Sequence, residues 1–136
     1  MAALTQTAAN VGVGSVTSSV RVVQVGEAVA QGKPGYRLES DGKYYIGDAD
    51  DAGKDDIAVI FLTPASTDGY AAVALPGAKV NLGATLVVGT AYYLLASGSI
   101  GLHSDIASSD YVTLLGIAET ADLLLFNPQV SSIAKP

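Results

Sequence analysis

Few side chains in this chain of 136 residues could act as acids, bases or nucleophiles. The sequence has no Cys, no Trp and a single histidine, His103. A nucleophile triad would need His103 to face a serine and an aspartate, and Ser104 and Asp105 follow it directly. Adjacent residues on a strand point to opposite faces, so these three cannot assemble locally. The G-x-S-x-G turn of hydrolases is also absent. We therefore predict that the chain has no catalytic residues and is not an enzyme.

An acidic segment offers the next candidate for chemistry, because carboxylate oxygens on a tight turn are the ligands of calcium. The spacing D-x-D-D-x-G resembles part of a calcium loop, but no Glu stands at the twelfth position and no long helices flank it. A solvated loop, with a short helix allowed at 49–56, is the alternative. We predict that this loop holds no metal and that the protein has no cofactor. The acidic residues are Asp48, Asp50, Asp51, Asp55 and Asp56.

Two tyrosine pairs could form a platform for a sugar, because an aromatic ring can stack on the apolar face of a sugar ring. They are Tyr44-Tyr45 and Tyr92-Tyr93. On a strand, each pair puts one ring on either face of the sheet. Packing in a core or at an interface is the alternative use of these rings. Both uses stay open, and the first keeps a carbohydrate-binding β-module among the possible functions.

Charge and hydropathy exclude several partners. The net charge is −6, and the seven basic residues are scattered singly along the chain, whereas nucleic-acid binding needs clustered Lys and Arg. No apolar stretch approaches the ~18 residues that span a bilayer. The N-terminus shows neither a basic region nor an apolar core typical of a signal peptide. We expect no nucleic acid and no membrane as partners, and synthesis in a cytoplasm.

Short apolar runs separated by glycine-containing turns predict an all-β fold, a small barrel or sandwich. The clearest local signal is Asp41-Gly42 between two alternating aromatic runs, which predicts a hairpin whose turn residues have a structural role only. The run at 57–63 is apolar on both faces and predicts a central strand. The remaining expected strands are 20–25, 36–39, 43–46, 70–75, 79–82, 85–88, 91–96, 111–118 and 122–126.

The chain divides by composition into an N-terminal arm (1–19), a β domain (20–130) and a C-terminal tail (131–136). The arm is uncharged and dominated by small residues, so it cannot form a core alone. It carries Leu4, Val11, Val13 and Val16, which we expect to lie along a neighbouring chain as an added strand. The arm is then mobile in the free protein and ordered on its partner.

The body resembles phage capsid cement proteins, also called head decoration proteins. The resemblance rests on VGEAVAQGKPGYRLESDGKYYIGDADDAG (25–53), AAVALPGAKVNLGATLVVGTAYYLLASGSIG (71–101) and YVTLLGIAETADLLLF (111–126). These segments match the family's Asp-Gly hairpin, its "-GAT-xx-VG-xx-YYL-" run and its closing pair of strands. The likeness covers roughly residues 20 to 127.

The resemblance implies a small barrel-like or tulip-like β domain on the outer surface of a bacteriophage head. Its partners are then the major capsid protein and two further copies of itself in a trimer. The family has no catalytic residues, so the resemblance transfers none. The base domain of a head-fibre or tail-fibre component is the alternative within virion proteins. The implied location is the virion.

Overall fold

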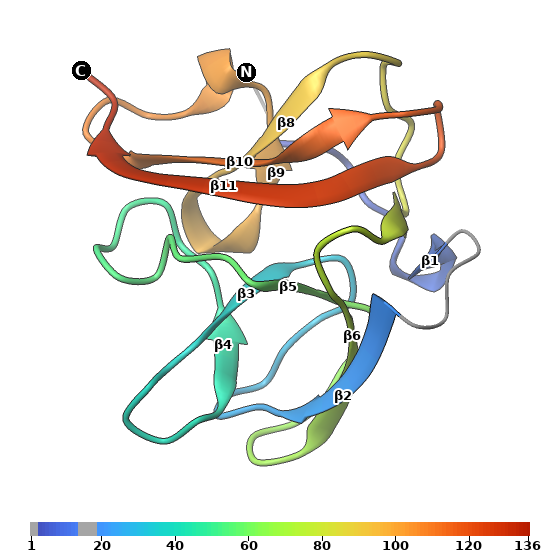
Figure 1. Ribbon diagram of the computed structural model, residues 1–136, viewed down its shortest axis with the longest axis vertical. Helices are drawn as coiled ribbons and strands as arrows, with labels where there is room; N and C mark the ends of the chain where they lie inside the picture. The colour runs from blue at the N-terminus through green and yellow to red at the C-terminus, as the bar shows by residue number, and fades with distance from the viewer. Residues whose placement is uncertain (1–2, 14–18) are drawn as a thin grey trace.

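The computed structural model describes residues 3–13 and 19–136, and these residues form two antiparallel β-sheets (Figure 1). The six-stranded sheet A has the order β1-β7-β11-β10-β8-β9, and the five-stranded sheet B has the order β2-β6-β5-β3-β4. The all-β prediction is confirmed, although the sheets do not close into a barrel. The elements in chain order are η1 (Ala8–Asn10), β1 (Val11–Val13), β2 (Val20–Gln24), β3 (Pro34–Arg37), β4 (Tyr44–Ile46), β5 (Val59–Phe61), β6 (Tyr70–Ala74), β7 (Lys79–Leu82), β8 (Ala91–Leu94), η3 (Ala96–Gly98), β9 (Ile100–Gly101), η4 (His103–Asp105), β10 (Tyr111–Ala118) and β11 (Leu124–Ala134).

Sheet B lies between two hydrophobic clusters, and its central strands bury apolar side chains on both faces. Its strand β5 is buried at all three positions, as the doubly apolar run predicts, and it is the central strand of the sheet. Ile60 faces the larger cluster, which sheet A completes, whereas Val59 and Phe61 face a smaller cluster inside the curl of sheet B. A single bridge from Val25 to Tyr44 joins the two edge strands of this sheet. Sheet B therefore curls around its own core without closing.

Sheet A packs across the larger cluster and supplies most of its bulk. Leu94, Leu115 and Phe126 point inward and are fully buried. In Figure 1 the long hairpin of β10 and β11 crosses the molecule above sheet B, and the acidic loop lies below the C-terminal half of β11. The two sheets thus form a two-layer body, with β10 and β11 as its outer layer.

Several elements differ from those expected from the sequence, and β3, for example, begins at Pro34 instead of Tyr36. Residues 85–87 form an irregular loop that leads into a turn at Val88 and Gly89. The Leu86 amide donates to the Ala121 carbonyl in the β10–β11 connection, and the Gly89 amide donates to the Ala118 carbonyl at the end of β10, without forming a strand. Residues 49–56 form turns and no helix. The strand β11 continues to Ala134, so most of the expected tail at 131–136 is paired with β10.

Candidate functional site

The N-terminal segment lies on the body of its own chain. Val11, Gly12 and Val13 pair with Leu82, Asn81 and Val80 of β7. Earlier in the segment, the Leu4 amide donates to the Ile100 carbonyl at 2.8 Å, and Gln6 Nε2 donates to two carbonyls on different segments. Leu4, Val11 and Val13 are half-buried against the larger core cluster.

This arrangement differs from the expectation that the arm is mobile in the free protein, because residues 3–13 pack on their own domain. Uncharged, β-branched residues can add a strand to an open sheet edge, and here they add one to the edge of β7 in the same chain. The three residues proposed to contact a capsid are therefore already engaged within the chain. Binding of a neighbouring subunit by the arm stays a prediction, and Val16 lies outside the described residues.

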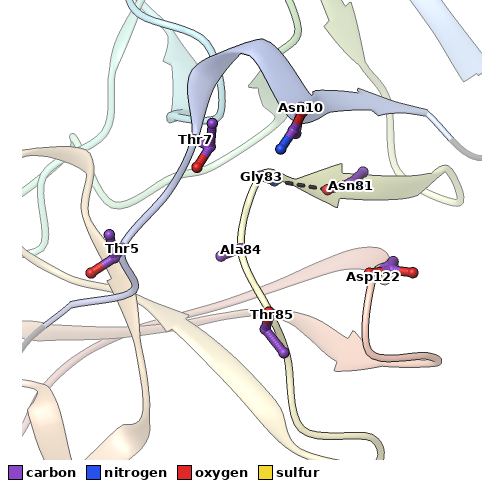
Figure 2. Close-up of a pocket in the computed structure, with 8 residues that line it drawn as sticks. All are labelled: Thr5, Thr7, Asn10, Asn81, Gly83, Ala84, Thr85 and Asp122. Atoms are coloured by element: carbon purple, nitrogen blue, oxygen red, sulfur yellow. Dashed lines mark hydrogen bonds between the residues drawn. The ribbon is translucent and has the colours of Figure 1, made fainter.

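A polar pocket of about 410 Å³ lies between this N-terminal segment and the loop after β7 (Figure 2). Its lining has hydroxyl, amide and carboxylate groups but no imidazole, thiol or amine. Several hydrogen bonds join residues of the lining. The Gly83 amide donates to Asn81 Oδ1 (Figure 2), the Thr7 amide donates to the Gly83 carbonyl, and the Asn10 amide donates to the Thr7 carbonyl. Such a pocket can hydrogen-bond a polar molecule. The lining residues are Thr5, Thr7, Asn10, Asn81, Gly83, Ala84, Thr85 and Asp122.

The predicted hairpin is present, and its turn is organised by Asp41 and Gly42. The strands β3 and β4 pair antiparallel around it, and Gly42 has a φ of 71°. Asp41 accepts hydrogen bonds from the Lys43 amide at 2.9 Å and from the Tyr45 hydroxyl at 2.5 Å. The hydrogen bond to Asp41 raises the pKa of Tyr45 to about 12 and lowers the pKa of Asp41. The structural role expected for the turn residues fits this geometry.

The sole histidine is exposed and joins no catalytic group. His103 begins η4 and packs edge-on against Tyr93, with ring centroids 5.3 Å apart. The Asp105 carboxylate accepts a hydrogen bond from the Leu102 amide at 3.0 Å, so it stabilises the turn. His103 and Asp105 thus have separate structural partners, although they are close in sequence.

The acidic residues are spread around their loop. Among residues 3–13 and 19–136, no cluster of acidic or histidine side chains could hold a metal ion. Lys54 forms an ion pair with Asp51 at 3.2 Å. The neighbouring Asp48 raises the pKa of Asp50, through a shared hydrogen bond and like charge. Asp55 differs from the others because it is buried, with 4% of its surface exposed.

The tyrosines proposed as a sugar platform are engaged with the protein itself. Tyr44 and Tyr92 are buried. Tyr45 stacks on Tyr36 at a centroid distance of 5.9 Å, and Tyr93 meets His103 as described above. A platform for a sugar needs an aromatic face open to solvent. Tyr45 and Tyr93 are half-buried, and the sugar-binding use stays a prediction.

The outer face of sheet A and the loop beside it carry an apolar patch that we did not predict from the sequence. Ile117 and Leu125 are direct cross-strand partners on β10 and β11, and they are 49% and 38% exposed. Val87 and Val88 lie on the loop that hydrogen-bonds to Ala118, next to Ile117, and both are more than half exposed. We call these four residues the apolar patch. Exposed apolar side chains that gather in one place are typical of binding surfaces.

A signal for this patch exists in the sequence. Leu124, Leu125 and Phe126 are consecutive apolar residues on one strand, so one of them must face away from the core if the other two face it. The same holds for Ile117, between Gly116 and Ala118. Continuous apolar runs also occur in doubly buried strands. Only the structure shows that no layer of the described chain covers the outer face of sheet A.

No protein-family model matches the chain, and no curated protein matches it.

Proposed function

We propose that this chain is a bacteriophage head decoration protein, which binds the outside of an assembled capsid and reinforces it. The apolar patch on the outer face of sheet A carries the proposal. The patch is apolar and exposed, as the binding surface of such a protein would be, and the sequence of the body resembles capsid cement proteins. The proposed partners are the major capsid protein and other copies of the chain, and the proposed location is the virion surface.

The physical role follows from the binding preference. A protein that binds the assembled lattice, and not free subunits, stabilises the lattice by mass action. Burying one large apolar side chain contributes roughly 1.5–3 kcal/mol. Repeated over a lattice, a few such side chains per copy would add substantially to the cohesion of a shell.

Image reconstruction of virions that contain the chain tests the proposal. We expect density for this two-sheet fold at repeated positions on the outer shell, with the apolar patch facing the major capsid protein. Density restricted to a fibre base or tail would favour the fibre-component alternative, and absence from the particle would refute both. Binding of a glycan array by the pure protein would instead favour the carbohydrate-binding alternative.

A homotrimer is the proposed oligomeric state. Light scattering coupled to size exclusion should then give three times the chain mass of 13.7 kDa. A strict monomer at micromolar concentration, both free and on particles, would contradict this part of the proposal.

A further inference from the structure

The C-terminal half of β11 has one open edge. Among the described residues, β7 is the strand beside β11 on that side, and it pairs only with Leu124 and Leu125. Beyond Phe126 the strand continues for eight residues, paired with β10 alone. An edge strand of this kind presents free amide and carbonyl groups to another chain.

This overhanging half-strand lacks the charged side chains that often protect an open edge, although it keeps a proline, which is another such protection. The segment Asn127–Ala134 has no charged residue, and it exposes Val130 and Ile133. Pro128 and the positive φ of Ser132 (56°) interrupt its regularity. The register shifts between Val130 and Ala134, and Ala134 again pairs with Tyr111 of β10. The edge can therefore accept a short added strand.

A groove lies between the C-terminal part of β11, Tyr111 of β10 and the acidic loop. Its volume is about 560 Å³, and its lining residues are Ala52, Gly53, Asp55, Asp56, Tyr111, Val130 and Ser132. In Figure 1 the loop lies directly below the C-terminal half of β11. Side chains of an added strand alternate between the two faces of a sheet. Every second side chain of such a strand would therefore face the side of the sheet on which this groove lies.

The groove contains a carboxylate oxygen that lacks a partner. Asp55 is buried, and its Oδ2 has no hydrogen bond, while Oδ1 accepts one from the Gly53 amide at 3.2 Å. The Asp55 carbonyl accepts a hydrogen bond from Thr113 Oγ1 at 2.9 Å, which fixes the residue in place. Buried polar oxygens are nearly always paired, so an orphaned one points to a missing donor. The adjacent Lys54 is paired with Asp51 and does not supply it.

We infer that this edge and groove together form a docking site for one extended segment of another protein, which adds a strand to β11 and places a Lys or Arg side chain beside Asp55 and Asp56. The site is separate from the apolar patch, and it does not depend on the proposed role on a capsid. A second copy of the chain is a poor occupant. It would bring its own acidic loop against this one, where like charges repel.

A display library of random dodecapeptides, selected on the immobilised full chain, is the probe. We expect enrichment of sequences in which a Lys or Arg stands among β-branched residues. A synthetic peptide of the enriched sequence should bind about tenfold more weakly to the Asp56→Asn variant, since a charge-assisted contact is lost. It should also protect the amides of residues 127–134 from hydrogen exchange.

Two further variants make the test specific. Val130→Lys places a competing cation in the groove and should abolish peptide binding. Asp122→Asn removes a charge from the polar pocket of Figure 2 and should leave peptide binding unchanged. Asp56 is exposed, so its substitution preserves the fold. Asp55→Asn adds a direct test if its circular dichroism matches that of the parent chain.

Three results would overturn the inference. They are a selection that yields no enriched sequence, enriched peptides without a basic residue, and peptide binding that survives Val130→Lys. Self-association that Val130→Lys abolishes would assign the edge to a second copy of this chain instead.

Discussion

At the scale of single residues, the turn after β3 shows how one glycine controls a hairpin. Gly42 occupies the left-handed region, where a β-branched residue is strained. An added Cβ would meet only the end of the flexible Arg37 side chain, at 3.3 Å. The cost of substitution therefore comes mainly from the backbone.

Gly42→Val should lower the free energy of unfolding by about 1 kcal/mol or more, because Val disfavours a positive φ. Chemical denaturation of both chains measures the difference. Gly42→Asn is the matched control, since Asn tolerates this conformation and should lose less. Equal stability of the Val variant and the parent chain would show that the turn does not need this conformation.

The hydrogen bond between Tyr45 and Asp41 gives a second residue-scale prediction. It raises the pKa of Tyr45 from 10.0 to about 12, so the folded protein holds this proton more tightly than the unfolded chain does. The resulting stabilisation is fully present below pH 10 and is lost as the pH rises toward 12.

Absorbance titration of the tyrosines measures this shift, with Tyr45→Phe identifying the contribution of Tyr45. In the Asp41→Asn variant, Tyr45 should titrate closer to its ordinary pKa. The difference in stability between the parent chain and Tyr45→Phe should also shrink across the same alkaline range. A Tyr45 titration that is the same with and without the Asp41 carboxylate would refute the assignment.

At the scale of elements, the N-terminal segment packs on its own domain, and this packing is independent of any partner. The Thr7 amide donates to the Gly83 carbonyl at 2.5 Å, where the segment crosses the end of β7. Gly83 has a φ of 75°, and an added Cβ would stand 2.2 Å from the Thr7 carbonyl oxygen. Gly83 is thus required both for its turn and for the close approach of this segment.

Gly83→Ala should destabilise the chain more than Gly77→Ala does. Both glycines have positive φ, but an added Cβ at Gly77 has no atom within 4 Å. The comparison therefore isolates the contact with the N-terminal segment from the strain of the turn. We expect an excess of roughly 1–3 kcal/mol, the usual cost of overpacking.

Deleting residues 2–13 should itself lower the melting temperature, because β1 and the half-buried Leu4 are lost. In that shortened chain the excess cost of Gly83→Ala should vanish. If the deletion leaves the melting temperature unchanged, or if the excess persists, the segment does not pack on the body in solution.

The sequence predicts most of the strands because their apolar runs and turns are local signals. The hairpin at Asp41 and Gly42, and the central strand at 57–63, are confirmed. The continuation of β11 beyond Phe126 was missed, because Pro128 and the paired serines resemble the end of a strand. Pro128 is tolerated because this part of β11 has an open edge. The edge is open because β7 ends beside Leu124 and Leu125, which the local sequence does not show.

The candidate surfaces depend on still longer-range contacts. Asp55 lies 58 positions before Thr113, which holds it in place, and no pattern near either residue predicts that pairing. The pairing of the N-terminal segment with β7 could not be predicted either, because its composition is equally suited to pairing with a strand of another protein. Sequence reasoning therefore identified the arm but not the sheet edge to which it pairs.

At the scale of the whole molecule, the body presents surfaces with different chemistry. The outer face of sheet A is apolar around Ile117 and Leu125, whereas the acidic loop near β11 carries much of the negative charge. Exposed apolar side chains favour a contact that excludes water, and the acidic loop favours a basic partner. This separation lets one small domain make two kinds of contact at once.

The last prediction concerns the apolar patch and its proposed place against the capsid. Ile117→Lys, alone or with Leu125→Lys, should lower the occupancy of the protein on purified heads by about tenfold or more, because a charge replaces a central apolar contact. Both side chains point to solvent from sheet A, so circular dichroism and the melting temperature should stay close to those of the parent chain. Tyr70→Lys is the control, since Tyr70 is 66% exposed on sheet B and outside the patch. The mass of the free protein from light scattering should be the same for all variants. Full occupancy of Ile117→Lys on heads would show that the patch faces away from the lattice, and loss of self-association together with occupancy would show that the patch joins copies of the chain.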